Sequence, residues 1–247
     1  MLAALLVGCA TVDSRPRARI DTNVHKANFS LTSAEKLFGS VFGSRLAKSE
    51  FDTEAQYHAR LEQMRPTGSY FILVAPHFVR YVYSAEIQRL VVLADQTGSD
   101  IMVAYSSQNL GKVPMQNAFG ATVDATLIKS RSLELEVQNP PLSFPQGLVW
   151  KQNSNIGVYG MQDIGLGLPV SIAPAEAERV VKNKTYGLVI GFTVGDLSRA
   201  RREKGGSAPT FDAPIGIGGY TSKLPVTVHY LAILDRRTDN VVASWSE

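Results

Sequence analysis

Hydrophobic residues recur along the chain at two spacings, and the change from one to the other predicts helices followed by strands. A short helix is expected over residues 32–38, ended near Gly39. A second helix begins after Thr53, where the sequence matches a capping box, and stops before Pro66. A third begins at Pro174, because proline fits the first turn of a helix. The pattern therefore predicts three short helices.

After residue 68 the spacing becomes two, which is the period of a β-strand. Alternation of apolar and polar residues indicates one wet and one dry face, as is typical of antiparallel sheets. Strands are expected at residues 69–74, 80–83, 88–93, 100–105, 121–127, 133–137, 186–194, 223–235 and 241–245. The last two form a hairpin around a five-residue loop. We therefore expect a sheet-rich α+β fold with mainly antiparallel strands.

No Gly/Ser-rich linker, fixed-period repeat or block of like charges divides residues 31–247, so we expect a single α+β domain there. The segment 195–219 shows no clear period, and within it five charged residues from Arg199 to Lys204 are followed by two glycines. A loop of this length is usually mobile or functional. We expect a mobile loop near 195–219, with a contact to a partner as the alternative.

The composition is that of a globular protein. Of the 247 residues, 45% are hydrophobic and 19% are charged, which is too apolar for a disordered chain. The net charge is +3, without the clustered surplus typical of nucleic-acid binding, so we expect no nucleic-acid partner. A single cysteine excludes an intramolecular disulfide and a zinc site built from several cysteines.

That cysteine, Cys9, ends an apolar run and precedes a polar, basic segment. The run is too short to span a bilayer, which takes about 20 residues, but fits the end of a secretory signal peptide. The tetrad Leu6-Val7-Gly8-Cys9 resembles the lipobox of bacterial lipoproteins. The resemblance implies that residues 1–8 are a signal remnant and that Cys9 is lipidated, with diacylglycerol on its thiol and an acyl chain such as palmitate on its amine. The alternative is that residues 1–9 form an apolar strand or helix in which Cys9 is a small buried hydrophobe.

The lipobox also implies a location. Ala10 follows the cysteine, and in Gram-negative lipoproteins the absence of Asp at that position implies sorting to the outer membrane, facing the periplasm. Residues 9–30 are then the lipidated cysteine and a flexible polar tether. Residues 10–30 contain four basic and two acidic side chains, a net charge of +2. This segment either lies beside anionic lipid or is a solvated linker.

Two further strings resemble segments of uncharacterised exported proteins of Gram-negative bacteria. Phe51–Arg60 resembles a helix opening in that group, and Gln116–Gly120 resembles a second string. The resemblance implies no activity and no site residue. Asn117 and Gly120 are typical turn residues, and we expect the turn to aim Phe119 into the core.

Motifs for catalysis, metal binding or cofactor binding are missing from the sequence. None of the four histidines has a partner at metal-ligand spacing: His25, His58, His77 and His229. No GxSxG nucleophile motif is present. The glycine clusters at 165–170 and 216–219 are not followed by the helix start that a phosphate-binding loop needs, so we interpret both as loops. We therefore expect no cofactor and no metal.

Two residue pairs share a strand face. Glu134 and Glu136 are interpreted as solvent-facing charges that discourage aggregation, rather than as the paired carboxylates of glycoside chemistry. Tyr81 and Tyr83 fit either half-buried sheet packing or a stacking platform, and we expect the packing.

Two classes of function remain. The first is an outer-membrane-anchored periplasmic lipoprotein that is not catalytic and acts as a binding or scaffolding subunit of an envelope assembly. Its partners are the membrane, through the lipid anchor, and a protein of the envelope.

The second class is a periplasmic hydrolase with a dispersed site using His77 or His229. A cleft holding a histidine near a carboxylate and a hydroxyl favours the enzyme, and an exposed apolar patch or bare sheet edge favours the binding protein. A third possibility, a carrier of a small ligand, would need a closed apolar cavity.

Overall fold

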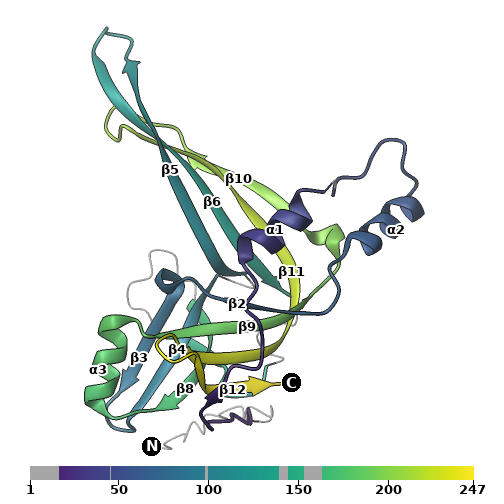
Figure 1. Ribbon diagram of the computed structural model, residues 1–247. Helices are drawn as coiled ribbons and strands as arrows, with labels where there is room; N and C mark the ends of the chain where they lie inside the picture. The colour runs from purple at the N-terminus through teal and green to yellow at the C-terminus, as the bar shows by residue number, and fades with distance from the viewer. Residues whose placement is uncertain (1–16, 45, 98–99, 139–143, 153–162) are drawn as a thin grey trace, which may run out of the picture.

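The fold is described by a computed structural model for residues 17–44, 46–97, 100–138, 144–152 and 163–247 (Figure 1). The described residues are sheet-rich, with 52% in strands and 18% in helices, in agreement with the predicted α+β class. The described residues form three α-helices: α1 (Ala34–Phe42), α2 (Glu54–Met64) and α3 (Pro174–Asn183).

Helices α2 and α3 begin where the sequence predicts, and α1 begins two residues later than predicted, at Ala34. The Thr53 side chain accepts a hydrogen bond from the Gln56 backbone, and the Gln56 side chain accepts one from the Thr53 backbone, so α2 has its capping box. The end predicted for α1 is wrong, because the helix continues through Gly39. Val41, one turn after Leu37, is 2% exposed and extends the apolar stripe that packs on the core.

The described strands are β1 (His25–Lys26), β2 (Ser69–Leu73), β3 (Val79–Ser84), β4 (Arg89–Thr97), β5 (Asp100–Gln116), β6 (Thr122–Val137), β7 (Val149–Gln152), β8 (Asp163–Ser171), β9 (Tyr186–Val194), β10 (Arg201–Ser207), β11 (Ile215–Asp235) and β12 (Asn240–Ser246). Most ladders are antiparallel, as predicted, and β11 and β12 form the predicted hairpin. β6 and β11 pair in parallel over twelve positions. The two short strands expected at 121–127 and 133–137 are one strand, β6.

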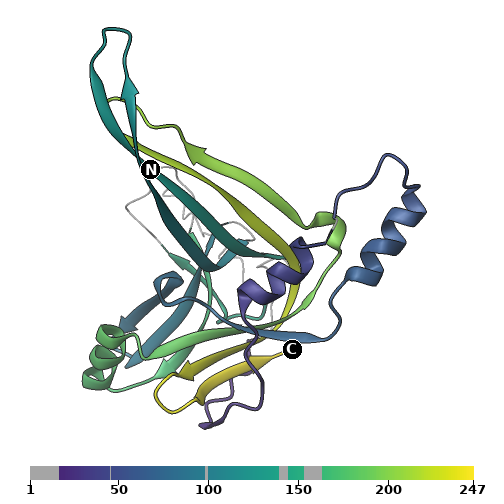
Figure 2. The same cartoon turned by 45° about the horizontal axis from the view of Figure 1, so that its top comes forward.

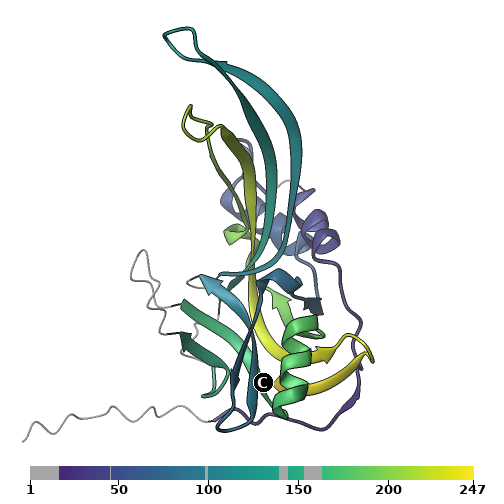
Figure 3. The ribbon, with the colours of Figure 1, turned by 90° about the vertical axis from the view of Figure 1, so that its left-hand side faces the viewer.

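β11 connects the two parts of the molecule. Its second half, from Val226, pairs with β9 and β12 inside the body. Its first half pairs with β6 on one side and β10 on the other. The sheet β5-β6-β11-β10 projects from the body in all three views (Figures 1, 2 and 3). We call its residues 105–132 and 201–221 the arm.

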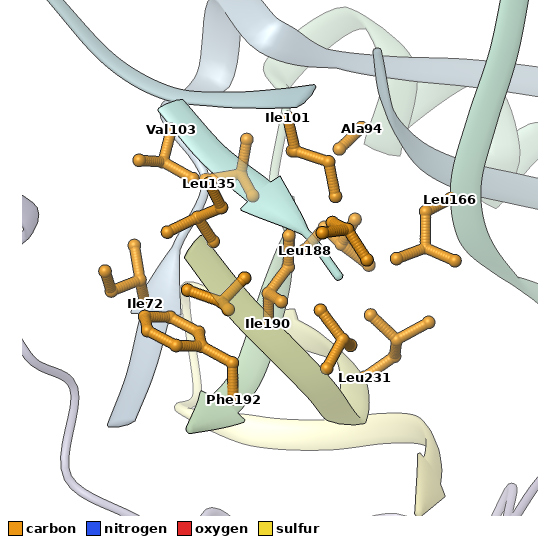
Figure 4. Close-up of a cluster of buried hydrophobic side chains, with 14 of the residues drawn as sticks. Ile72, Ala94, Ile101, Val103, Leu135, Leu166, Leu188, Ile190, Phe192 and Leu231 are labelled. Atoms are coloured by element: carbon orange, nitrogen blue, oxygen red, sulfur yellow. The ribbon is translucent and has the colours of Figure 1, made fainter. Parts of the chain in front are cut away.

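The core lies in the body, below the arm. Ile72, Ile101, Leu135, Leu188 and Leu231 come from five different strands and meet in one cluster (Figure 4). β9 is buried at eight of its nine positions, which explains its nearly continuous apolar sequence. Among the described residues of the arm, by contrast, only Ala125 and Gly216 are buried. The arm is therefore held by its strand ladders and its base rather than by a core of its own.

Two segments expected to be loops are strands. Within 195–219, residues 201–207 form β10 and residues 215–219 begin β11, so the prediction of a loop there is wrong over both ranges. The glycine cluster at 165–170 lies in β8, and the one at 216–219 lies in β11. In β8, a Cβ atom on Gly167 would clash with the Val92 carbonyl oxygen, so the close approach of β4 requires glycine.

The predicted tether at 9–30 differs from the structure where the structure describes it. Asp21 and Ser244 exchange two backbone hydrogen bonds, and β1 pairs with β12. Phe29 stacks on Phe71 at 4.9 Å between ring centroids. Residues 17–31 therefore lie along the body, where the backbone groups of Asp21, His25 and Lys26 complete the edge of β12.

Candidate binding surfaces on the projecting arm

Cys9, the one site residue that the sequence singles out, lies outside the described residues. Its lipidation therefore stays a prediction. Among the residues that the structure describes, no helix is both long and apolar enough to cross a bilayer.

The structure separates the histidines. His58 lies on α2 beside Glu54, and both side chains are more than half exposed. His77 is exposed in the 3-10 turn η1 (Pro76–Phe78) and contacts the Phe78 ring. His229 lies in β11, where its ring meets Phe71 edge-on. In the described part of the chain, no three or more His, Cys, Asp or Glu side chains are placed to hold a metal.

Tyr81 and Tyr83 are half-buried, as the packing interpretation predicts. The Tyr81 hydroxyl donates to the carbonyl oxygen of Tyr186, and the Tyr83 hydroxyl donates to that of Ile172. Burial raises the pKa of Tyr81 above its ordinary value, because the phenolate would be poorly solvated. These rings tie β3 to the segments around α3.

The interpretation of Glu136 as a solvent-facing charge is wrong. This residue is 7% exposed at the base of the arm. Its carboxylate accepts a hydrogen bond from Arg201 Nη1 at 2.7 Å and one from Arg199 Nη2 at 3.3 Å. A carboxylate with so little access to water needs such partners, because its charge is otherwise costly to bury.

Glu134, on the same face, is also largely shielded from water. Its carboxylate lies 3.8 Å from Lys223 Nζ, which contacts Asp100 at 2.7 Å and Glu203 at 3.2 Å. Burial raises the pKa of Glu134, while the hydrogen bond to Asp100 raises the pKa of Lys223. Together with Glu136 and its arginines, these residues form a network that clamps β5, β6, β10 and β11 at the base. We call this side of the arm the ion-paired face.

The opposite face of the arm carries basic side chains that form no ion pairs with described residues. Strand register places Arg131 beside Tyr220 and Tyr220 beside Lys204, and alternation adds Lys129 and Arg202 to the same side. Within the described residues, none of these four cations pairs with a carboxylate, and the register brings no Asp or Glu of the arm's strands to this side. We call it the basic face.

Aromatic rings support the guanidinium groups of the basic face. Arg202 lies 5.0 Å from the centroid of Tyr220 and 5.2 Å from that of Phe42 on α1, and Arg131 lies 5.8 Å from Tyr220. Helix α1 thus covers the base of this face, and no helix or strand of the described residues covers the face above α1 (Figure 1). Cation–π contacts orient these arginines without neutralising them.

Two hollows mark the basic face. The larger has a volume of about 730 Å³, and its lining includes Leu110, Leu127 and Gly218 as well as Lys129, Lys204 and Tyr220. The smaller, about 200 Å³, shares Lys129 and Tyr220 and adds Ser106, Gln108 and Arg131. The glycines of β10 and β11 open the larger hollow because they present no side chains there.

The arm also exposes large apolar side chains. The prediction that Phe119 points into the core is wrong: it is 96% exposed at the tip of the β5–β6 hairpin. The turn itself is as predicted, because the Asn117 side chain accepts hydrogen bonds from the backbones of Phe119 and Ala121. Further exposed apolar residues of the arm and its second loop are Leu110, Val113, Phe211, Ile215 and Ile217.

Sequence reasoning missed the basic face, although one signal was present. In β10, Arg201 and Glu203 alternate with Arg202 and Lys204, so one side is charge-balanced and the other is purely basic. The alternation has this meaning only in a strand, and the sequence predicts a loop over this segment. Comparisons with protein-family models, curated proteins and solved structures found no match for this chain.

Proposed function

We propose that this chain is an outer-membrane lipoprotein, anchored through Cys9 and facing the periplasm, that serves an envelope assembly as a non-catalytic binding subunit. Its arm is the element that contacts the partner protein, and residues 31–247 act as one domain. The lipobox supports the anchor. The observation that carries the binding role is the arm itself, which exposes apolar residues on a sheet outside the core.

The edges of the arm support the same role. β5 pairs with β4 only at Asp100 and Ile101, so the rest of its outer edge has no strand partner among the described residues. β10 likewise pairs with β11 on one side. An uncovered strand edge is a ready site for a partner strand.

The position of the anchored end fits this role. Cys9 and Arg17 are eight residue steps apart along the chain, which span at most about 29 Å. Arg17 pairs with Gln146, and the following residues run along β12, at the end of the body away from the arm (Figures 1 and 3). A protein held at Cys9 therefore directs its arm away from the anchored end.

The test combines cell fractionation with crosslinking. The unaltered chain is expected in the outer-membrane fraction, and Cys9→Ser is expected in the soluble fraction, because it cannot accept the lipid. A photoreactive amino acid at position 119 is expected to form a specific adduct with an envelope protein in the anchored form.

Phe51 provides the matched control, because it is 86% exposed but lies outside the arm, before α2. The same photoreactive residue at position 51 is expected to give no such adduct. Unchanged fractionation of Cys9→Ser would refute the anchor. Equal adducts from positions 51 and 119 would refute the arm as the contact element.

A further inference from the structure

The larger hollow of the arm combines an apolar lining with positive charge. Its volume of about 730 Å³ is in the range of small-ligand sites, which span roughly 300–1,000 Å³. Leu110, Leu127, Ala208 and Pro209 give it an apolar lining, while Lys129 and Lys204 also line it. An occupant must therefore satisfy both an apolar surface and positive charge.

The apolar part has room for a chain. Gly218 lies at the register position opposite Lys129, and a Cβ atom built on it meets nothing within 4 Å. Leu110, which forms part of the lining, is 56% exposed and so leaves apolar surface in contact with water. Covering such surface is favourable by about 25 cal/mol per Å².

The basic side chains at the hollow are placed so that they can bind an anion. Lys129 and Arg131 lie on β6, and Arg202 and Lys204 lie on β10, with Tyr220 of β11 between them. The strand spacing separates the two groups of cations by about 10 Å, so an acidic group above Tyr220 is within reach of both. The cations retain their full attraction, since none pairs with a carboxylate in the described residues.

We propose that the hollow binds one molecule of an anionic amphiphile. Its acyl chain lies along Leu110, Leu127 and Gly218, and its phosphate or carboxylate head contacts Lys129 and Lys204, with Arg131 close by. A neutral amphiphile leaves the cations uncompensated, and a small inorganic anion leaves the apolar lining exposed. This inference rests on the proposed role of the arm as the binding element and names a ligand for it.

The experiment measures binding of monomeric lysophosphatidylglycerol to the full-length Cys9→Ser chain by titration calorimetry, below the micelle-forming concentration of the lipid. We expect saturable binding of one molecule, at least tenfold tighter than binding of zwitterionic lysophosphatidylcholine. Inorganic phosphate alone is expected to bind at least a hundredfold more weakly, because it gains nothing from the apolar lining.

Two variants separate the parts of the site. The double variant Lys129→Gln, Lys204→Gln is expected to lower the affinity for lysophosphatidylglycerol at least tenfold and to leave that for lysophosphatidylcholine unchanged. Gly218→Leu fills the apolar part and is expected to weaken the binding of both lipids. Lys36→Gln and Gly39→Leu, at exposed positions of α1, are the matched controls and are expected to change neither. Thermal unfolding confirms that each variant folds.

Each other outcome overturns the inference. Equal affinity for the two lipids excludes a role for the cations, and phosphate binding as tight as lipid binding excludes a role for the apolar lining. Binding only to intact phosphatidylglycerol vesicles would indicate a membrane surface instead of a single lipid. Absence of lipid binding with an intact adduct from position 119 refutes this inference alone, whereas loss of both refutes the proposed function as well.

Discussion

Glu134 and Glu136 lie two residues apart on one strand face, but their carboxylates have different cationic partners. Glu136 accepts hydrogen bonds from two guanidinium groups, Arg199 and Arg201. Glu134 has one nearby cation, Lys223 at 3.8 Å, and shares it with Asp100 and other carboxylates. Glu136 therefore has two cationic partners for its charge, while burial dominates at Glu134 and raises its pKa.

The two corresponding glutamine variants are expected to act in different directions. Glu136→Gln should lower the free energy of unfolding at pH 7 by about 1.5 kcal/mol, because it removes charge-assisted hydrogen bonds. Glu134→Gln should raise it or leave it unchanged. The folded carboxyl of Glu134 holds its proton more tightly than the unfolded one, whose pKa is near 4.5, so ionisation above that pH costs stability.

Urea unfolding between pH 4 and 8 measures both effects. The advantage of Glu134→Gln over the unaltered chain should disappear below about pH 4.5, where Glu134 is protonated in both the folded and the unfolded states. Glu62→Gln on α2 is the control, because its ion pair with Arg65 is exposed. Loss of stability at pH 7 as large for Glu134→Gln as for Glu136→Gln would show that Lys223 outweighs burial.

At the scale of elements, glycines decide how closely strands and helices approach their neighbours. Gly167 of β8 faces the backbone of β4, where a Cβ atom would lie 2.6 Å from Leu93 Cα. Gly39 of α1 faces open space, with no atom within 4 Å of a Cβ. The same residue type therefore permits close sheet packing in one element and only weakens the helix in the other.

Alanine at these two positions is expected to have opposite effects. Gly167→Ala should destabilise the protein by about 3 kcal/mol, since backbone must move to admit the methyl group. Gly39→Ala should stabilise it by about 0.5–1 kcal/mol, because alanine favours the helix. Thermal or urea unfolding measures both, and a loss below about 1 kcal/mol for Gly167→Ala would contradict the close packing of β4 on β8.

At the scale of the whole molecule, the core and the proposed binding surfaces are separated. The cluster around Ile72, Leu188 and Leu231 lies in the body (Figure 4), and the two hollows lie on the arm. The network around Glu136 and Lys223 sits where the two parts join. This arrangement lets the arm carry exposed apolar groups without weakening the core.

Shortening the arm tests this separation. Replacing residues 107–130 with Asn-Gly joins the paired residues Ser106 and Arg131 through a two-residue hairpin turn. The free energy of unfolding should change by less than about 2 kcal/mol, because Ala125 is the one residue buried in the removed part. Urea unfolding followed by circular dichroism and by fluorescence should stay a single coincident transition, and separate transitions would contradict a single domain in the body.

Several elements could be predicted from sequence because their causes are local. The capping box at Thr53 uses groups three residues apart, and the β11–β12 hairpin joins strands through a short turn. β9 was predicted with its observed bounds, 186–194, because every position but one is buried and apolar. Local hydrogen bonds, and the burial of a whole segment, can be predicted from a short stretch of sequence.

The arm could not be predicted, because what surrounds each of its residues is set by distant strands. Glu136 is paired with arginines more than sixty residues away, and β6 meets β11 about ninety residues along the chain. Alternation showed that Glu134 and Glu136 share a face, and the turn at Asn117 was recognised. Only the tertiary structure decided that this face is closed by ion pairs, that Phe119 lies in water, and that four cations gather without partners. The sequence by itself determined the local elements and which residues share a strand face. Which of the two faces is exposed to water depends on the segments that pack against it, and those segments are brought there by long-range strand pairing.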